Sequence, residues 1–500
     1  MTTEMLQAAA ASNQWWAIGP EVILACSALV LLAAEIVLPR KEHRFIPWLA
    51  LMAQAAVLIG LVLNFDTSWL NETTFNGLLR HTYEGQVGRV FFTVAAMLVT
   101  FLGLVCLPRS KMPRVEFFAL VKVITAAMML LGQSNHFVLF FVALETVTIG
   151  FYILVSYYRD NALTLEAGLK YLVTGALSSS ILLFGIVLLY GAVGRGPAGL
   201  TGFDFGAVRL FLQENPDHFL GVLGALLVLS GMAFKIGAFP FQVWVPDVYQ
   251  GAPTPVTAFL AVSSKAAGFA VLLVLTRTIF APILWIMLPV LTAMAAATIL
   301  FGNLAALSQR HPKRLMGLSG VSHAGFLLMG VAASFTQPWA ASAVWFYLFT
   351  YLLASMAVFG VMAHVVGAND ADMDLDHYDR LAREQPLLAG VLAVGVGSLA
   401  GIPPLAGFIG KLLVFIAAFQ AGLYWLLAVA VAGVVVSIYY YFGWIKAAFF
   451  ETWRLDNEPL PAHPRQPVAL LSAVVLAALA LATVAIGLFQ QPLTSWVLNR

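Results

Sequence analysis

Long apolar stretches follow one another along nearly the whole chain, separated by short segments that contain charges, proline or glycine. A helix needs about 20 apolar residues to cross a bilayer, and these stretches have that length. The alternation of apolar and polar residues that marks a barrel strand is absent from them. The sequence therefore predicts an all-α polytopic membrane protein with about 14 transmembrane helices. The expected spans are 18–38, 46–64, 88–107, 115–132, 136–157, 162–191, 217–240, 253–277, 281–303, 313–333, 339–366, 387–418, 422–447 and 467–490.

Composition and charge support a membrane protein and exclude several other classes. Hydrophobic residues make up 61% of the chain, charged residues 10%, and the mean hydropathy is +0.90, which leaves too little polar surface for a soluble globule. A net charge of +2 without a basic stripe argues against a nucleic-acid partner. The apolar composition makes membrane lipid the expected surroundings of the chain. No Lys or Arg precedes the first span, so it is expected to be retained as a helix.

The distribution of basic residues predicts the orientation. When the loops are assigned alternately to two sides, 15 of the 26 Lys and Arg residues fall on one side and six, including Arg89, on the other. The side richer in Lys and Arg is normally cytoplasmic. Both termini are therefore expected on the opposite, outer side of the membrane.

Six ionisable residues interrupt the apolar spans. A lysine at the centre of a membrane helix costs roughly 2.5–3.5 kcal/mol on insertion scales, so such residues usually mark a path for ions or protons. The six are Glu145, Lys122, Lys170, Lys235, Lys265 and Lys411. Lys122 follows Arg114 by two turns and is expected to extend to the cytoplasmic surface.

Two spans contain helix breakers beside a lysine. Gly237 and Pro240 follow Lys235, and Pro403 and Pro404 precede Lys411. Proline removes a backbone donor and obstructs the preceding turn, so both spans are expected to be discontinuous. Unwound backbone in a membrane is buried in protein or lines a wet cavity, and paired broken helices mark the transport site of internally repeated transporters.

The spacing of these residues indicates an internal repeat. Lys411 lies 176 residues after Lys235, and the same offset carries Glu145 to within two residues of His323 and Lys265 onto Tyr441. The predicted domains are N-terminal helices in 1–114, five-helix units in 115–280 and 281–450, and a final helix in 451–500. Because each unit has an odd number of helices, the second unit is expected to cross the membrane in the opposite orientation to the first. A chance alignment stays open, because the lysine precedes the break in one unit and follows it in the other.

Each candidate site residue has a structural alternative. Glu145 and Lys235 form either a switchable proton site or a purely structural buried ion pair. Lys265 has Ser263, Ser264 and Gly268 nearby to hydrate it, which favours a place on a proton path. Lys170 follows Glu166 by four residues and is either a channel residue or half of an interfacial ion pair.

His323 is either a relay between Lys265 and Lys411 or a hydrogen-bonded core histidine. Neither His323 nor His364 has the ligand partners of a haem site. Cys26 and Cys106 are expected to be small core residues without a disulfide or metal. The sequence thus predicts no metal site.

Two apparent motifs lack their structural context. Gly194, Gly196 and Gly199 match GxGxxG, but no strand precedes them and Pro197 interrupts the run, so the chain itself is not expected to bind NAD. The alternating Asp370, Asp372, Asp374 and Asp376 lack the glycine and the final glutamate of a calcium loop. They are interpreted as a solvated acidic linker.

Five long segments resemble a known family. They are FVALETVTIGFYILVSYYRD, LEAGLKYLVTGALSSSILLFGIVLLYG, GMAFKIGAFPFQVWVPDVYQGAPTPVTAFLAVSSKAAGF, KRLMGLSGVSHAGFLLMG and GIPPLAGFIGKLLVF. Together they resemble the antiporter-like membrane subunits of bacterial respiratory complex I, the proton-translocating NADH–quinone oxidoreductase. Lys411 and the PDVYQGAPTPVTAFL segment favour the subunit N family over its sister subunits M and L.

The resemblance implies a proton channel of two half-channels in the bacterial inner (plasma) membrane, driven by quinone reduction elsewhere in the complex. By motif position it pairs Glu145 with Lys235, makes Lys265 the connecting residue and makes Lys411 the terminal proton carrier. It implies neighbouring A, J, K and M subunits and a peripheral arm. It places FMN, iron–sulfur clusters and quinone in partner subunits, with no cofactor and no redox chemistry in this chain. A subunit of a multisubunit cation/proton antiporter and a passive scaffold are the alternatives.

Overall fold

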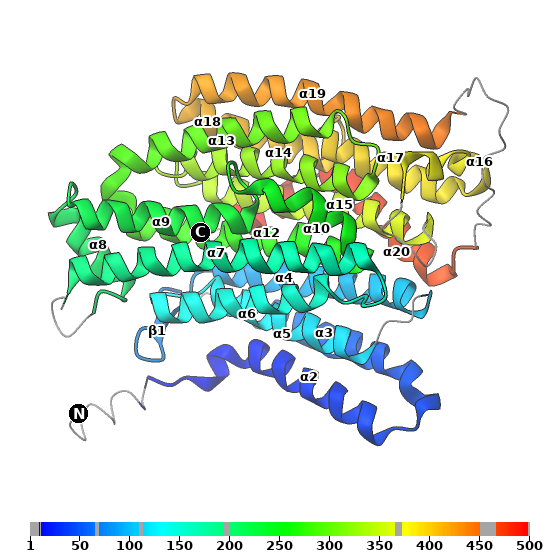
Figure 1. Cartoon of the computed structure of the whole chain (residues 1–500), viewed down its shortest axis with the longest axis horizontal. Helices are drawn as coiled ribbons and strands as arrows, with labels where there is room; N and C mark the ends of the chain where they lie inside the picture. The colour runs from blue at the N-terminus through cyan, green and yellow to red at the C-terminus, as the bar shows by residue number, and fades with distance from the viewer. Residues whose placement is uncertain are drawn as a thin grey trace.

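The computed structural model describes residues 10, 12–65, 70–109, 114–194, 201–365, 373–450 and 467–498. Within these ranges almost every element is a helix, and most of the helices lie side by side along one common direction (Figure 1). Strands β1 (Thr73–Thr74) and β2 (Leu79–Arg80) pair antiparallel in a small hairpin. The predicted all-α membrane architecture is confirmed.

Twelve helical stretches of the described chain are long and apolar enough to cross a membrane. Eleven of these contain the single helices α2 (Gly19–Val37), α3 (Ile46–Leu63), α4 (Tyr83–Cys106), α6 (Phe137–Val155), α7 (Ala162–Val193), α9 (Phe219–Ile236), α13 (Leu284–Ala306), α14 (Pro312–Ala333), α15 (Ala340–Val365), α19 (Tyr424–Phe449) and α20 (Leu470–Leu488). The twelfth, Thr254–Ile279, comprises α11 (Thr254–Phe259), the π-helical turn η6 (Leu260–Ser264), α12 (Lys265–Val274) and the π-helical turn η7 (Leu275–Ile279).

Shorter helices complete the bundle. α5 (Val115–Leu131) packs against α2 and α6, and the apolar helices α17 (Pro386–Ala400) and α18 (Ala406–Gln420) follow each other across a break. When α5 is counted as one span and the broken pair α17 and α18 as another, the twelve stretches become about 14 spans, as expected. The remaining helices are α8 (Phe205–Glu214), α10 (Val245–Gly251), α16 (Leu381–Glu384) and α21 (Gln491–Leu498).

Helix α14 lies at the centre of the bundle. Its apolar window is 100% buried, compared with 28% for the window of α2 and 22% for that of α20. It packs against α10, α13, α15, α18 and α19, so polar side chains on α14 face protein. A titratable group on this helix can therefore interact with groups from both broken segments.

Both predicted helix breaks are present. α9 ends at Ile236, Gly237 adopts a left-handed conformation with φ 70°, and α10 begins at Val245. α17 ends at Ala400, Gly401 has φ 84°, and α18 begins at Ala406. Glycine at the position after a helix accepts this conformation without the steric penalty of a side chain. The last carbonyl groups of α9 and α17 are thus left inside the protein.

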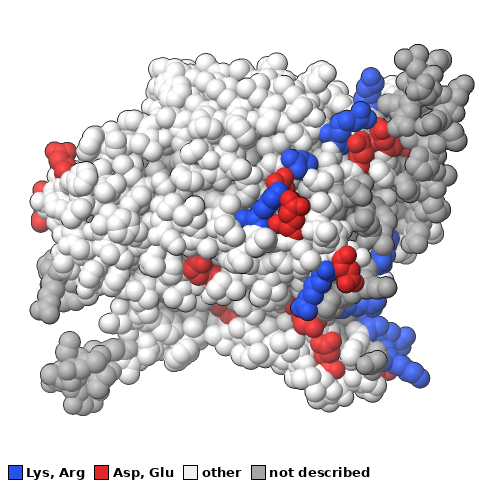
Figure 2. All heavy atoms as spheres, in the orientation of Figure 1, with Lys and Arg blue, Asp and Glu red and all other residues white. Residues whose placement is uncertain are grey.

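Charged residues are unevenly distributed along the long direction of the bundle. Figure 2 shows Lys and Arg gathered toward the end of the molecule at which α16 lies in Figure 1. Arg310 pairs there with Asp374 and Asp376, which flank the start of the 3-10 helix η9 (Leu375–Tyr378). Asp370, Asp372, Gly196 and Gly199 lie outside the described residues.

Substituting Gly487 tests the packing of α20 against the second break. A Cβ atom at Gly487 would overlap the backbone carbonyl oxygen of Pro404, which cannot move without shifting the break. We expect Gly487→Ala to destabilise the fold by about 1–3 kcal/mol, as overpacking does. The measurement is the temperature at which the assembled complex loses this chain. Gly443→Ala is the matched control, because no atom lies within 4 Å of the Cβ it adds; equal melting of the two variants would contradict the packing.

Candidate functional site

Lys235 is buried in the last turn of α9, where its ammonium group contacts α6 and α7. Its Nζ donates to Thr148 Oγ1 at 2.7 Å and to Ser179 Oγ at 3.3 Å. Glu145 Oε1 lies 3.6 Å from the same nitrogen and accepts a hydrogen bond from Ser179 at 2.6 Å. The side chain of Glu145 is 21% exposed, whereas that of Lys235 is 6% exposed. The predicted pair is present, and Ser179 bridges it.

Lys265 lies directly after the π-helical turn η6, in the interior of the bundle. Its Nζ donates to the carbonyl oxygen of Gly320 on α14 at 2.5 Å. A Cβ atom at position 320 would lie 2.8 Å from this nitrogen, so the glycine permits the approach. The ring of Tyr351 lies under the ammonium group, 5.4 Å away. No carboxylate neutralises Lys265 among the described ion pairs.

His323 is buried on α14 between two tyrosines. Its Nδ1 lies 2.7 Å from the Tyr347 hydroxyl oxygen, and its Nε2 lies 3.0 Å from the Tyr441 hydroxyl oxygen. Both ring nitrogens are therefore hydrogen-bonded, which satisfies the core-histidine alternative. The same arrangement suits a relay, because imidazole can accept a proton at one nitrogen while it releases one from the other.

Lys411 is buried on α18, but its ammonium group contacts α17. Its Nζ donates to the carbonyl oxygens of Leu399 and Ala400 at 2.8 and 2.9 Å. These carbonyls end α17, where the helix dipole favours a positive charge. Lys235 lies in the corresponding last turn of α9. The two lysines thus reach similar positions although their order relative to the break is reversed in the sequence.

Helix α14 connects these groups at helical spacing. Gly320 accepts from Lys265, His323 follows three residues later, and the ring of Phe326 lies 5.3 Å from the Lys411 ammonium group. Residues three apart on a helix lie on the same face. Lys265, His323 and Lys411 are therefore arranged along one face of the most buried helix.

A small cavity separates Lys235 from the segment that carries Lys265. It has a volume of about 10 Å³ and is lined by Lys235, Thr148, Ser264 and Gly268, among others. This volume is at the lower limit for one water molecule. Polar side chains line both ends of the gap, so the site is suited to a single bridging water.

Lys170 lies apart from this series, on the exposed flank of α7. Its Nζ lies 2.7 Å from both Glu166 Oε1 and Asp247 Oδ2, and its side chain is 45% exposed. Arg314 also pairs with Asp247 at 2.8 Å. The geometry matches the ion-pair alternative for Lys170.

Two expectations were wrong. Lys122 does not extend to the surface: it is fully buried and donates to Ser27 Oγ at 3.0 Å, because α5 turns this residue toward α2. Cys26, which directly precedes Ser27 on α2, is exposed and is not a core residue, while Cys106 is partly buried. His364 is buried and its Nδ1 contacts the Gly360 carbonyl oxygen at 2.8 Å.

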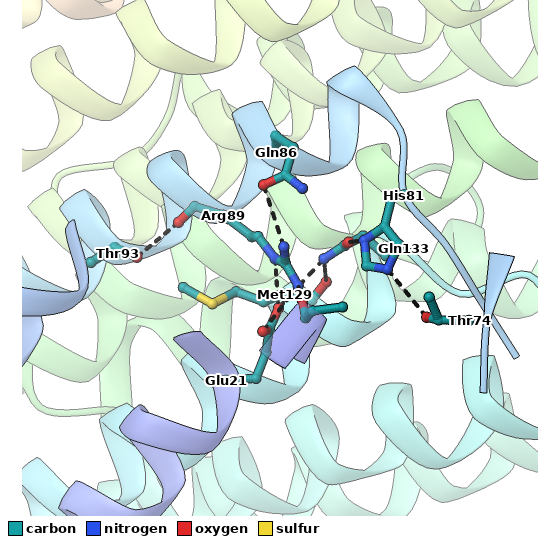
Figure 3. Close-up of polar contacts among 9 residues, drawn as sticks. Glu21, Thr74, His81, Gln86, Arg89, Thr93, Met129 and Gln133 are labelled. Atoms are coloured by element: carbon teal, nitrogen blue, oxygen red, sulfur yellow. Dashed lines mark hydrogen bonds and ion pairs between the residues drawn. The ribbon is translucent and has the colours of Figure 1, made fainter. Parts of the chain in front are cut away.

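A buried ion pair that the sequence did not predict joins α2 to α4. Arg89 donates from Nε to Glu21 Oε1 at 2.7 Å and from its Nη2 to Glu21 Oε2 at 3.0 Å (Figure 3). Both side chains are at least 96% buried. Gln133 and His81 extend the network toward the hairpin. Arg89, counted above among the loop residues, is thus a buried structural residue.

His81 adds no charge to this network at neutral pH. Burial, and then the positive charge of Arg89, lower the pKa of His81 below its usual range, although the hydrogen bond with Gln133 opposes the shift. A histidine with a lowered pKa is neutral at pH 7. The negative charge of Glu21 is therefore neutralised by Arg89 alone, without a contribution from His81.

Neutral side chains complete the lysine sites, and the sequence pointed to few of them. Thr148 and Ser179 hold Lys235, while Tyr347 and Tyr441 hold His323. Of these four residues, the sequence analysis had picked out Tyr441, from its offset of 176 residues to Lys265. Thr148 lies one turn from Glu145 on α6, a spacing that could have indicated it.

Comparisons with known proteins agree with this architecture. A family model described as "NADH:quinone oxidoreductase/Mrp antiporter, TM" matches residues 134–437. The NADH-quinone oxidoreductase subunit N 1 of Opitutus terrae is 60% identical and covers 100% of both chains. A chain of respiratory complex I from Thermus thermophilus is 32% identical with a TM-score of 0.77, covering 95% of this chain and 98% of its own.

A chain of the Mrp complex from Dietzia sp. DQ12-45-1b has a TM-score of 0.79 over 97% of each chain, and at 21% identity this likeness concerns the fold alone. The family model spans more than half of this chain. The relatives from Opitutus terrae and Thermus thermophilus are both more than 30% identical to it and are matched over nearly their full lengths. The chain therefore belongs to the subunit N family of the NADH–quinone oxidoreductases, within the NADH:quinone oxidoreductase/Mrp antiporter membrane family.

Proposed function

We propose that this chain is a proton-translocating subunit of an NADH:quinone oxidoreductase, in which protons pass along Glu145, Lys235, Lys265, His323 and Lys411. The observation that carries the proposal is the placement of these groups. Lys265, Lys411 and His323 are buried around α14, whereas Lys235 is buried against α6 and α7. Each of the four has neutral hydroxyl or carbonyl oxygens among its hydrogen-bond partners. Such residues are costly in a membrane bundle and therefore usually mark a path for ions or protons.

The Glu145–Lys235 pair supplies the switch in this proposal. Burial favours the neutral form of a lysine, and a nearby carboxylate favours the charged form. Glu145 is the more exposed partner and contacts Lys235 partly through Ser179. A small movement of the carboxylate away from Lys235 therefore promotes release of a proton toward Thr148 and the cavity beside Ser264.

We further propose that the route has two halves built on related units. The units are residues 115–280 and 281–450, preceded by helices in 1–114 and followed by 451–500. Lys235 lies in the last turn of α9, and the ammonium group of Lys411 reaches the last carbonyls of α17, which supports this division. Lys265 and His323 then join the halves through α14. Lys170, in its exposed ion-pair cluster, is not required for the route.

The assembly follows from the family. We propose that the chain lies in the bacterial inner membrane with both termini on the periplasmic side, and that the end rich in Lys and Arg faces the cytoplasm. Its proposed neighbours are the A, J and K subunits on one side and subunit M on the other. FMN, iron–sulfur clusters and quinone belong to partner subunits, whose redox reaction drives the proton transfer.

A native gel tests the assembly. A membrane extract in mild detergent is stained for NADH dehydrogenase activity and blotted for this chain. We expect one very large band that carries both signals. Migration in a smaller band without NADH activity would contradict membership of the oxidoreductase.

A subunit of a multisubunit cation/proton antiporter is the second candidate, and the fold shared with the Mrp complex favours it. The two functions differ in their need for sodium. Quinone-linked proton pumping that is unchanged without added sodium supports the first function. Proton movement that requires sodium and proceeds without NADH supports the second.

A further inference from the structure

A second buried polar chain reaches His323 from the end of the bundle at which α13 and α19 finish. Tyr440 and Tyr441 lie side by side on α19, with ring centroids 4.6 Å apart. The Tyr441 hydroxyl oxygen lies 3.0 Å from His323 Nε2. The Tyr440 hydroxyl donates to Asn303 Oδ1 on α13 at 3.1 Å. The three helices thus bring a series of polar groups, Asn303, Tyr440 and Tyr441, to the histidine.

Asn303 fixes the outer end of this chain. Its Nδ2 donates to the carbonyl oxygen of Ile299 at 2.9 Å, which turns Oδ1 toward Tyr440. It lies three residues before the end of α13 and is 1% exposed. Gly433 brings α19 close, since a Cβ there would lie 2.8 Å from Asn303 Nδ2. The amide is therefore held near the end of the bundle that carries Arg310 and Lys446.

Two buried polar atoms beside this chain have no partner among the described residues. They are the Trp444 Nε1–H, one turn beyond Tyr440 toward the end of α19, and Ser322 Oγ, next to His323. Both residues are at least 99% buried. Buried polar groups in native proteins are nearly always satisfied, and ordered water commonly does so. Ordered water at these two atoms would satisfy both of them.

We propose that Tyr440 and Tyr441 are relay residues of a proton inlet that loads His323 from the basic end of the bundle, with Asn303 as the positioning residue. This inference rests on the proposed proton-pumping function. Tyr440 accepts a proton from water on its outer side; its own hydroxyl proton, which is donated to Asn303 in this structure, turns toward Tyr441 and passes to that hydroxyl. Tyr441 passes its hydroxyl proton to His323 Nε2, in the tautomer that carries its hydrogen on Nδ1. Each hydroxyl gains one proton and loses one, and His323 becomes imidazolium.

The inlet gives the second half of the chain its own proton supply. In the proposed route, protons at Lys411 otherwise arrive only from Lys265. An imidazolium at His323 is positioned between Lys265 and Lys411, so it supplies either lysine after release. Tyr347, at Nδ1 of the histidine, is the hydroxyl through which the proton leaves the ring.

The test is Tyr440→Phe in the assembled complex, which removes the hydroxyl and keeps the ring. The measurement is NADH-driven proton pumping in sealed vesicles, in water and in deuterium oxide. We expect pumping to fall by at least about fivefold and the slowing in deuterium oxide to increase, because proton transfer becomes limiting. A merely structural loss does not change the isotope effect. Tyr439→Phe is the matched control, since this neighbouring tyrosine is 74% exposed and should pump normally.

The outcomes separate the inlet from the proposed function. Normal pumping by Tyr440→Phe, with impaired pumping by His323→Gln, would overturn the inlet and leave the function standing. Normal pumping by both His323→Gln and Lys235→Ala would overturn the proposed function itself. If Tyr440→Phe does not assemble, Asn303→Leu decides by the same two readouts, because it removes the acceptor that positions Tyr440.

Discussion

Alanine in place of Lys235 is expected to lower NADH-driven proton pumping by about tenfold or more, since the substitution removes the group that holds and releases the proton. The side chain is 6% exposed and receives its contacts from Thr148, Ser179 and Glu145, none of which is a base of similar strength. Because redox and pumping are coupled, quinone-dependent NADH oxidation should fall with it. The measurement is the initial rate of acidification in inverted membrane vesicles, alongside NADH consumption.

Lys446→Ala is the control for this prediction. Lys446 is also a lysine of an apolar helix, but it is exposed in the last turn of α19. We expect its loss to leave pumping within about twofold, as surface substitutions usually have small effects. Pumping by the Lys235→Ala complex at the rate of this control would show that the buried lysine carries no protons.

Replacing Arg89 with Met is expected to cause the largest loss of stability. The substitution leaves the Glu21 carboxylate buried without its partner, and breaking a buried ion pair in this way costs about 3–5 kcal/mol. Arg89 also donates to the carbonyl oxygen of Ala17, so the 3-10 turn that precedes α2 loses a contact as well. We expect little of this chain in the assembled complex, as measured by blotting native gels of heated membranes.

A double variant distinguishes the unpaired charge from lost packing. Replacing Glu21 with Leu in the Arg89→Met chain removes the stranded carboxylate, and buried pairs exchanged for apolar residues of similar size are often tolerated. Assembly should therefore recover substantially. Arg277→Met is the comparison, because its pair with Glu84 is 25–36% exposed and should contribute little. A double variant as unstable as Arg89→Met would mean that packing, not the charge, explains the loss.

The sequence predicted the helical architecture and both helix breaks because these depend on local chemistry. Apolar length determines a span, and Pro240, Pro403 and Pro404 lack the backbone donor that a continuous helix needs. Lys235, Lys265 and Lys411 were also recognisable as site residues, since the cost of a lysine in a membrane does not depend on a particular neighbour. The local part of the site could therefore be predicted before any contact was known.

What the sequence could not predict depends on which face of a helix meets which neighbour. Glu21 and Arg89 are 68 residues apart and lie near the ends of their spans, where charges are ordinary. Lys122 was expected at the surface, yet α5 turns it toward Ser27. The contact of the Lys411 ammonium group with the last carbonyls of α17 depends on how the chain folds back between α17 and α18, which the sequence does not show. Neutral partners such as Ser179 carry no signal at all in an apolar span.

The central claim is that Lys235 must release its proton, and Lys235→Arg tests this most directly. Arginine keeps the positive charge and the partnership with Glu145 but does not deprotonate in proteins. The measurement is the number of protons pumped per NADH oxidised in vesicles that contain the assembled variant complex. The proposed function predicts that arginine fails to restore pumping, as alanine does. Restoration of normal pumping by arginine would contradict it, and would make Glu145 and Lys235 a structural ion pair.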